Sequence, residues 1–347
     1  MSKATYLLKR LTSFDTNGLK QRIKQVRKIT GRSSLAVLWD MALCALRYEA
    51  GYIDYTIFGM YDMTAQQRKD ILTRGKNTKY VQALNDKEYC HFFNNKTEFL
   101  TLFSQEIGRE FLDLNKATPD DFLEFAHKHP VIIVKPESGL CGKNVEKLNT
   151  DEYDSCVTLY NTLKTGGQTL IEEVLTQHPS VNALYDGAIN TVRMVTMLDD
   201  EGVPHLLYAA LRLGSGGAVV DNFNSGGMVI PVDTQTGQLV GVAVNKKGEA
   251  FAAHPDSETV FHGYTLPNWK DACALVEKAA VKVPGVRLVG WDLALTPNGP
   301  VLVEGNHYPG HDIYQLVPQN PEKKGMLPVF DAVVPYDSLK NLIKKRK

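Results

Sequence analysis

Apolar positions recur with a helical period in the first part of this chain. Residues 19–29 and 34–48 place apolar side chains three and four positions apart, the spacing of one face of an α-helix. Thr64 can cap a further helix, and Gln67 stands at the capping-box position three residues later. We therefore predict that residues 1–85 are helical and have a structural or oligomerisation role.

After this region the pattern changes to short apolar runs bounded by turn residues, which is typical of strands. Strands are predicted at residues 131–135, 169–174, 190–198, 205–213, 228–232, 239–244, 287–295 and 301–304. One helix should begin at Thr118, which can cap it, because Pro119 suits its first turn and two acids follow. A second helix is expected at residues 269–282. Mostly antiparallel strands with interspersed helices indicate an α+β fold, with domains at residues 1–85, 86–175 and 176–347.

Composition and charge exclude several classes of protein. The 347 residues include 39 Lys and Arg against 39 Asp and Glu, and this zero balance argues against a general nucleic-acid binder. The five cysteines are widely spaced and form no CxxC pair, which favours reduced thiols over a disulfide framework or a zinc site. The sequence shows no signal peptide and no run of about 20 apolar residues. We expect a cytoplasmic protein without a transmembrane segment, whose basic end at residues 340–347 is a solvated helix terminus.

One candidate for phosphate binding follows a predicted strand. Residues 131–134 are apolar and lead to Lys135, after which a loop contains Ser138, Gly139 and Gly142. Glycines let backbone N–H groups approach an anion closely, and a lysine adds a point charge. The spacing matches neither a Walker A loop nor GxGxxG. The alternative is a plain hairpin with a lysine at its rim.

A second candidate lies in the last predicted hairpin, where two loop types are possible. A two-residue Asn-Gly turn would place Asp292 and Glu304 on opposite faces of the sheet. A three-residue loop at 297–299, with proline in its first position, pairs Leu295 with Val301. We favour this loop, and it places Asp292 directly opposite Glu304.

In that register the hairpin gathers oxygen ligands. Asn306 lies two residues beyond Glu304 and therefore shares its face. Two neighbouring carboxylates repel each other unless a cation lies between them. An oxygen set without His or Cys suits Mg²⁺ or Mn²⁺, whereas the alternative is an exposed polar sheet face.

Charged residues on three other strands are weaker candidates. Arg193 and Arg212 each interrupt an apolar strand, and arginine binds phosphate or carboxylate in a bidentate manner. The polar loop that contains Asp221 and Asn222 follows the second of these strands, which favours an anion site there. Glu172 ends another strand as part of an acid pair, which can contact adenine and ribose or can simply be solvated.

Together these stretches resemble the ATP-grasp superfamily, and especially its sugar-transfer-associated branch. The matching stretches, in order, are NDKEYCHFF, VIIVKPESGLCGKNV, LIEEVL, NTVRMVT, LRLGSGGAVVDNFNSGGM, HPDSE, GWDLAL and VLVEGNHYPG. They cover about residues 85 to 312. The resemblance implies an ATP-grasp fold, in which two α+β lobes grip ATP between antiparallel sheets, here preceded by a helical N-terminal region. The lobe at 86–175 would carry the lysine strand, and that at 176–347 the Mg²⁺ site.

The resemblance also implies roles for particular residues, with ATP and Mg²⁺ (or Mn²⁺) as cofactors. The ATP contacts would come from Lys87, Lys135, Ser138, Gly139, Gly142, Glu172, Glu173, Val174 and Gln177. The metal ligands would be Asp292, Glu304 and Asn306, and the groups at the transferred phosphoryl Arg193, Arg212 and Asn306. Substrate contacts would come from Asp221, Asn222, His254, His307 and His311.

The activity implied is an ATP-dependent ligase that joins a carboxylate to an amine or thiol through an acyl phosphate. Its substrates would be small molecules or a sugar precursor, and the enzyme could be a homodimer. Several such ligases carry an arginine two residues before the metal-binding aspartate, where this chain has Gly290. Arg193, Arg212 or Arg287 can substitute for it. The alternatives are a kinase of a sugar or polyol hydroxyl on the same scaffold, and a nucleotide sensor without turnover.

Overall fold

The computed structural model describes residues 15–137, 144–217, 221, 223 and 226–345. The chain forms two compact units, the first of residues 1–78 and 311–328 and the second of residues 79–310 and 329–347. The expected ligand contacts Ser138, Gly139, Gly142 and Asn222 lie outside the described residues. The domain boundaries near residues 85 and 175 stay predictions.

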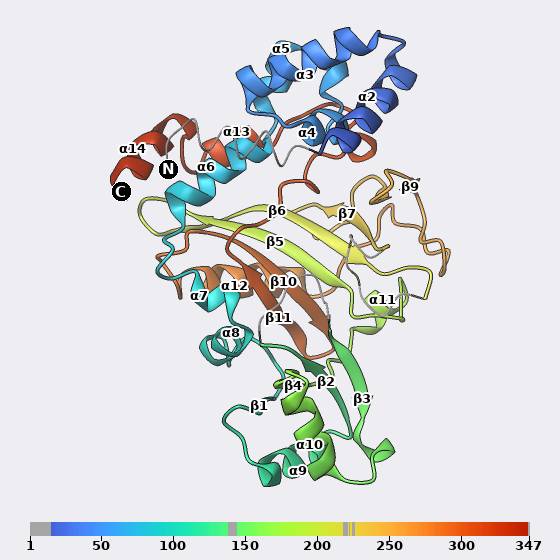
Figure 1. The fold of residues 1–347 in the computed structure, drawn as a ribbon, viewed down its shortest axis with the longest axis vertical. Helices are drawn as coiled ribbons and strands as arrows, with labels where there is room; N and C mark the ends of the chain where they lie inside the picture. Colours follow the sequence, from blue (N-terminus) through green and yellow to red (C-terminus); the bar gives the residue numbers. More distant parts are fainter. Residues whose placement is uncertain (1–14, 138–143, 218–220, 222, 224–225, 346–347) are drawn as a thin grey trace. The chain divides into compact units, whose positions relative to one another are not determined.

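The first unit is built from helices (Figure 1). They are α2 (Thr16–Thr30), α3 (Ser34–Tyr48), α4 (Tyr52–Ile57), α5 (Ala65–Asp70) and the 3₁₀ helices η1 (Met60–Asp62) and η4 (Val317–Gln319); α6 (Arg74–Leu84) and α13 (Leu327–Asp331) continue into the second unit. The expected capping box is confirmed, because the Thr64 hydroxyl accepts from the Gln67 backbone N–H and the Gln67 side-chain oxygen accepts from the Thr64 backbone N–H. Within the described residues no single helix is long and apolar enough to cross a bilayer, although the bent pair α2 and α3 together reaches that length and composition.

A four-stranded antiparallel sheet forms one part of the second unit, with strand order β1-β4-β2-β3. The strands are β1 (Phe111–Asp113), β2 (Val131–Lys135), β3 (Glu146–Asn149) and β4 (Leu170–Glu173). The helices of this part are α9 (Pro119–Lys128), α10 (Cys156–Thr165) and the 3₁₀ helix η2 (Thr150–Glu152), whereas α7 (His91–Asn94) and α8 (Lys96–Leu102) contact strand β11 (Gly299–Asn306) of the larger sheet. Ile132, Val134 and Ile171 pack against α9 and α10. Because side chains alternate along a strand, Lys135 and Glu172 lie together on the opposite face.

A seven-stranded sheet with order β11-β10-β5-β6-β7-β8-β9 forms the other part, and every neighbouring pair is antiparallel. The strands are β5 (Thr191–Leu198), β6 (Pro204–Leu213), β7 (Met228–Val232), β8 (Ala243–Asn245), β9 (Ala250–Phe251), β10 (Leu288–Thr296) and β11 (Gly299–Asn306). The remaining helices are α11 (Pro179–Asn182), α12 (Trp269–Ala280), η5 (Tyr336–Ser338) and α14 (Leu339–Lys345). The expected α+β class with mostly antiparallel sheets and a helical N-terminal region is confirmed.

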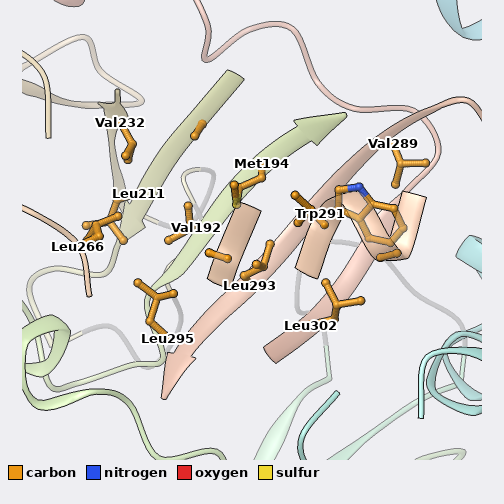
Figure 2. Close-up of a cluster of buried hydrophobic side chains, with 14 of the residues drawn as sticks. Val192, Met194, Leu211, Val232, Leu266, Val289, Trp291, Leu293, Leu295 and Leu302 are labelled. Carbon is orange, nitrogen blue, oxygen red and sulfur yellow. The ribbon is translucent and has the colours of Figure 1, made fainter. Parts of the chain in front are cut away.

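The main hydrophobic core lies between this sheet and α12 (Figure 2). Val192 and Met194 of β5 meet Trp291 and Leu293 of β10 there, and all four side chains are fully buried. The Trp291 indole N–H donates to the Thr196 hydroxyl at 2.8 Å, so its one polar atom is satisfied. Since these residues alternate with polar ones along each strand, the opposite face of the sheet is left for charged side chains.

Most of the predicted elements are present, and one strand is displaced. The helix predicted from Thr118 is confirmed as α9, with Thr118 as its cap. The strand expected at 239–244 is wrong, since Leu239 makes only an isolated bridge and β8 begins at Ala243. Gly241 between them has a φ of 74°, a left-handed conformation that interrupts a strand.

Glu106 provides a test of how this unit is held together. Its carboxylate is almost fully buried; it accepts from Lys282 at 2.5 Å and forms an ion pair with Lys278 at 3.0 Å. Burial opposes ionisation, but the two lysines outweigh it and lower the pKa of Glu106. Glu106→Gln removes both ion pairs and should therefore lower the free energy of unfolding at pH 7. The loss should be only about 1–2 kcal/mol, because both lysines can regain water.

The pH dependence gives the control for this prediction. A lowered folded-state pKa stabilises the protein fully above the unfolded value, about 4.3, and the contribution is lost as the pH falls through the folded pKa. Urea unfolding of both proteins should therefore show a difference at pH 7 that shrinks towards pH 3. A difference that does not change over this range would contradict the ion-pair explanation.

Candidate active site

The tip of the last hairpin differs from the expected three-residue loop. The turn consists of two residues between Thr296 and Gly299, and Leu295 pairs with Pro300 rather than with Val301. Gly299 has a φ of 115°, which residues with a side chain rarely adopt. The predicted loop length is therefore wrong.

The two acids nevertheless face each other, because a β-bulge compensates for the shorter turn. Leu293 pairs with Leu302, but the next pair is Asp292 with Glu304, so Val303 is an extra residue in β11. Without the bulge a one-residue slip would send Glu304 to the other face of the sheet. The pairing of Asp292 with Glu304, predicted from a different loop, is present.

Arg109 holds the bulge from outside the hairpin. Its guanidinium donates to the Leu302 carbonyl at 2.7 Å and to the Val303 carbonyl at 3.2 Å. The Leu302 N–H in turn donates to the Glu106 carbonyl at 2.8 Å. The Arg109 side chain is 1% exposed, so these bonds are protected from water. The segment that precedes β1 thus covers the edge of β11 and stabilises its irregular register.

Asp292 is the centre of an ion-pair cluster on the polar face. Arg193, its direct neighbour on β5, binds both carboxylate oxygens, at 2.5 and 2.9 Å, and Arg212 of β6 adds a bond of 2.7 Å. Burial opposes the charge of Asp292, but the two arginines outweigh it and lower its pKa. Both arginines stay charged at any physiological pH, so this face of the sheet keeps two positive groups beside the acid.

The pKa of Glu304 is shifted in the opposite direction to that of Asp292. Its side chain stays open to solvent on one side, while protein atoms and the Asp292 carboxylate, which is within hydrogen-bond distance, surround the rest. Partial removal from water, together with the negative charge of Asp292, raises the pKa of Glu304. Two carboxyl groups so close must share a proton or a cation.

On the small sheet, Lys135 is held by Glu172. The Lys135 ammonium pairs with one carboxylate oxygen of Glu172, and Arg109 donates to the other at 2.8 Å. All three side chains are largely buried, and the two cations lower the pKa of Glu172 although burial opposes its charge. Because Arg109 also holds the bulge in β11, one arginine connects the lysine strand to the acid hairpin.

Lys135 and Glu304 line the same pocket, which has a volume of about 470 Å³. Its polar and aromatic lining comes from Phe93, Asn94, Lys96, Phe99, Lys135, Glu304, Asn306, His307 and Tyr308. Sequence reasoning missed Lys96. Burial and the charge of Lys135 lower the pKa of Lys96, while Glu304 raises it. Two lysines that repel each other beside the Glu304 carboxyl group suit a polyanion that carries a divalent cation.

Local structure explains the position of Lys96. Asn95 caps α8, so Lys96 is the first residue of this helix. The Lys96 N–H donates to the Glu137 carbonyl at 3.1 Å and the Asn95 amide to the Glu137 carboxylate at 2.8 Å. These bonds tie the helix start to the chain that leaves β2 after Lys135. The Asn-Asn-Lys sequence before an apolar run was the available signal.

The other expected ATP contacts lie in different surroundings. Lys87 occupies an exposed turn and does not line the pocket. Glu173 accepts from the Glu110 N–H at 3.0 Å, and Val174 follows β4 half-buried. Gln177 is buried, and its amide bonds the Tyr185 carbonyl and the backbone and side chain of Asn190. The amide nitrogen and oxygen of Gln177 thus both form hydrogen bonds within the protein.

Two expected substrate contacts also have internal partners. Asp221 accepts from the Thr191 N–H at 2.9 Å, from the Thr191 hydroxyl and from Arg212 at 3.3 Å; burial raises its pKa. His254 is 1% exposed, with Nε2 at 2.9 Å from the Gly214 carbonyl and Nδ1 accepting from Asp256. Since both ring nitrogens are used, the interpretation of His254 as a substrate contact has no free atom to support it.

The last two histidines separate into different units. His307 lines the pocket, contacts Asn94 Oδ1 at 2.9 Å through Nε2, and has a pKa lowered by burial. His311 belongs to the helical unit, where it is buried and its Nε2 lies 2.9 Å from the Asp54 carboxylate. Of the two, the structure brings only His307 to the pocket.

Gly290 leaves a space that Arg193 occupies. A side chain at this position would meet Arg193 Cδ at 3.4 Å, Arg193 Nη1 at 3.5 Å and Pro309 at 3.0 Å. Arg287 binds the Leu198 carbonyl and Asp200 instead, away from the acid pair. Of the arginines that could replace one at position 290, Arg193 and Arg212 contact Asp292.

The pocket thus joins Lys135 of the small sheet and Lys96 at the start of α8 to Glu304 of the large sheet, and comparisons with known proteins agree with this arrangement. The family model described as "Sugar-transfer associated ATP-grasp" matches residues 75–331. This match covers more than half of the sequence, so the chain belongs to the sugar-transfer associated ATP-grasp family. It confirms the resemblance, and ATP and Mg²⁺ are the cofactors of this class. No protein with a curated description matches the sequence.

Several solved structures resemble the chain at low identity. The ATP-grasp ligase PsnB, complexed with minimal precursor, Mg and ADP, is 14% identical with a TM-score of 0.42, over 75% of this chain and 62% of PsnB. D-alanyl-alanine synthetase A from Vibrio cholerae O1 biovar eltor is 14% identical with a TM-score of 0.45, over 74% of this chain and 67% of its own. D-alanine-D-alanine ligase from Coxiella burnetii is 12% identical with a TM-score of 0.44, over 79% and 68%. This chain thus spans about three fifths of the length of PsnB.

The residues present fit a hard divalent cation. Asp292, Glu304 and Asn306 supply only oxygen ligands, and the two carboxyl groups are close enough to need a shared positive charge. Among the described residues no group of three or more His, Cys, Asp or Glu side chains could hold a metal by itself. A site with two carboxylates and an amide leaves coordination positions for phosphate oxygens, as is usual for Mg²⁺.

Proposed function

We propose that this protein is an ATP-dependent ligase that activates a carboxylate as an acyl phosphate and joins it to an amine or thiol. The observation that carries the proposal is the pocket that Lys96, Lys135 and Glu304 line together. The Glu304 carboxyl group lies beside Asp292, which two arginines bind. These groups suit positioning and charge neutralisation, which is what phosphoryl transfer requires of a protein.

Each group then has a role at the phosphates. Lys96 and Lys135 would bind the ATP phosphates, and Asp292, Glu304 and Asn306 would hold Mg²⁺, which supplies charge neutralisation and orients the phosphates. Glu172 supports this role indirectly, because its contacts with Lys135 and Arg109 fix the lysine. Glu173 and Val174, directly after it, are proposed to contact the adenine.

The reaction would proceed in two balanced steps. A substrate carboxylate oxygen attacks the γ-phosphorus of ATP, and the bond to the bridging oxygen breaks so that ADP leaves. The amine then attacks the acyl carbon, phosphate leaves with the electron pair of the C–O bond, and the amine loses a proton. We assign Arg193 and Arg212 to the negative charge that develops in both steps. The space above Gly290, which Arg193 fills, supports this assignment.

The family description, which associates the fold with sugar transfer, supports a proposal for the substrates. We propose a carboxylate or amine on a sugar-linked, amino-acid or peptide-like molecule, in glycan or natural-product biosynthesis. The domains would be a helical region at 1–85, a lobe with the lysine strand at 86–175 and a lobe with the Mg²⁺ site at 176–347.

A kinase is the second candidate, and His307 favours it. Phosphorylation of a hydroxyl needs a base, and the lowered pKa of His307 keeps this pocket residue neutral at pH 7. His254 cannot serve, since both of its nitrogens are engaged. A base at His307 would act on an acceptor beside Asn306.

Trapping the intermediate distinguishes the two reactions. The protein, ATP and Mg²⁺ are incubated with hydroxylamine and a panel of sugar acids and amino acids, and ADP and hydroxamate are measured. We expect hydroxamate to form together with ADP, because hydroxylamine intercepts an acyl phosphate. ADP and a phosphate ester without hydroxamate would favour the kinase, and ATP binding without ADP release would indicate a sensor.

A further inference from the structure

Helix α3 is apolar on two faces, of which only one is packed. Val37, Met41 and Cys44 are buried against the core of the helical unit. Across the helix, Leu35 is 80% exposed, Trp39 68% and Leu46 83%. Leu38 on the same side is 43% exposed. These four residues, which we call the α3 stripe, recur at helical spacing along one face.

Helices α2 and α3 and the three residues between them carry a net positive charge, although the net charge of the whole chain is zero. Between residues 16 and 48 the basic residues are Lys20, Arg22, Lys24, Arg27, Lys28, Arg32 and Arg47. The single acid in this stretch is Asp40, which pairs with Arg68 at 2.6 Å and with Arg32 at 3.5 Å. Lys24, Arg27 and Lys28 are exposed on α2. Three residues separate α2 from α3, so the charges lie in the element next to the stripe.

We propose that α2 and α3 dock on an anionic membrane surface, with the α3 stripe inserted at the level of the lipid headgroups and the basic residues of α2 in contact with the anionic ones. Apolar side chains with a tryptophan beside a basic helix are the combination that such surfaces bind. This proposal does not depend on the function assigned to the pocket.

Charge favours this occupant over the others. A nucleic acid would bind the basic residues but would gain little from Leu35 and Leu46. A second copy of this chain would bring two sets of like charges together across the stripe, at an unfavourable electrostatic energy. An anionic lipid surface satisfies the apolar and the basic residues together.

The tryptophans make a direct test possible. Trp269 is 6% exposed and Trp291 is fully buried, so Trp39 is the solvent-exposed tryptophan of the three in the chain. The full chain is mixed with vesicles of phosphatidylcholine alone, or of phosphatidylcholine with phosphatidylglycerol. We expect co-sedimentation and a shift of the Trp39 emission to shorter wavelength only with the anionic vesicles, and weaker binding in high salt.

Two sets of variants test the two halves of the surface. Lys24→Gln, Arg27→Gln and Lys28→Gln together should weaken binding about a hundredfold, because each basic residue near an anionic surface contributes about a factor of five. The matched control replaces three exposed lysines of the other unit, Lys116, Lys246 and Lys247, by glutamine in a second variant. These three substitutions should leave vesicle binding unchanged.

The apolar half is tested in the same way. Leu35→Ser with Leu46→Ser keeps Trp39 as the reporter and should abolish the emission shift. The control, Val240→Ser with Val260→Ser, changes two exposed apolar side chains of the second unit. Both double variants should keep their thermal unfolding temperature, since the replaced side chains are exposed.

Other results would overturn the proposal. These are no binding to anionic vesicles, equal loss in the control variants, or a Trp39 shift that appears without vesicles as the protein concentration rises. The last would indicate that a second copy covers the stripe. Binding to a nucleic acid that persists in the Leu35→Ser and Leu46→Ser variant, with none to vesicles, would assign the charges to nucleic acid.

Discussion

Glu304→Gln and Asp292→Asn are each expected to reduce ATP turnover at least a thousandfold, because each removes a carboxylate from the proposed cation site. The two variants should differ in stability. Glu304→Gln relieves the repulsion from Asp292, so its unfolding temperature should be retained. Asp292→Asn loses charge-assisted bonds with Arg193 and Arg212, so its unfolding temperature should fall. ADP release and thermal unfolding measure the two effects.

The control for this pair is Glu201→Gln, which makes the same chemical change in an exposed turn. It should turn over ATP at the wild-type rate. If Glu304→Gln and Asp292→Asn both kept wild-type turnover, the assignment of these acids to the cation site would be wrong. This conclusion would hold whether or not the protein is a ligase.

Lys96→Met should lower kcat/KM for ATP about a hundredfold, and Lys87→Met should not. Lys96 lines the same pocket as Lys135, whose charge lowers the pKa of Lys96, whereas Lys87 lies on an exposed turn. Loss of one positive group at a phosphate usually has an effect of this size. The measurement is the ATP dependence of ADP release in the two variants, each lacking one lysine. An equal loss in both would restore Lys87 as a phosphate contact.

The sequence predicted local features well because their causes are local. The capping box at Thr64 and the helix cap at Thr118 each involve residues three positions apart, and both are present. Strand β2 has the predicted bounds because it is a short apolar run between turn residues. Such patterns are visible without knowledge of the rest of the chain.

Features that depend on distant contacts could not be predicted in this way. The Val303 bulge is held by Arg109, nearly two hundred residues earlier in the chain. The pairing of Asp292 with Glu304 was therefore obtained from a loop of the wrong length. His254 lay close to a recognisable motif in the sequence, but its partner Gly214 became apparent only in the fold.

The bulge also divides the hairpin into two segments with different pairing registers. Residues between the tip and Leu302 follow one register and residues from Glu304 onward follow another, and Arg109 holds the boundary. We expect Arg109 to keep the alignment of the two carboxylates when a residue is inserted in the turn near Thr296, because its bonds lie between the turn and the acids.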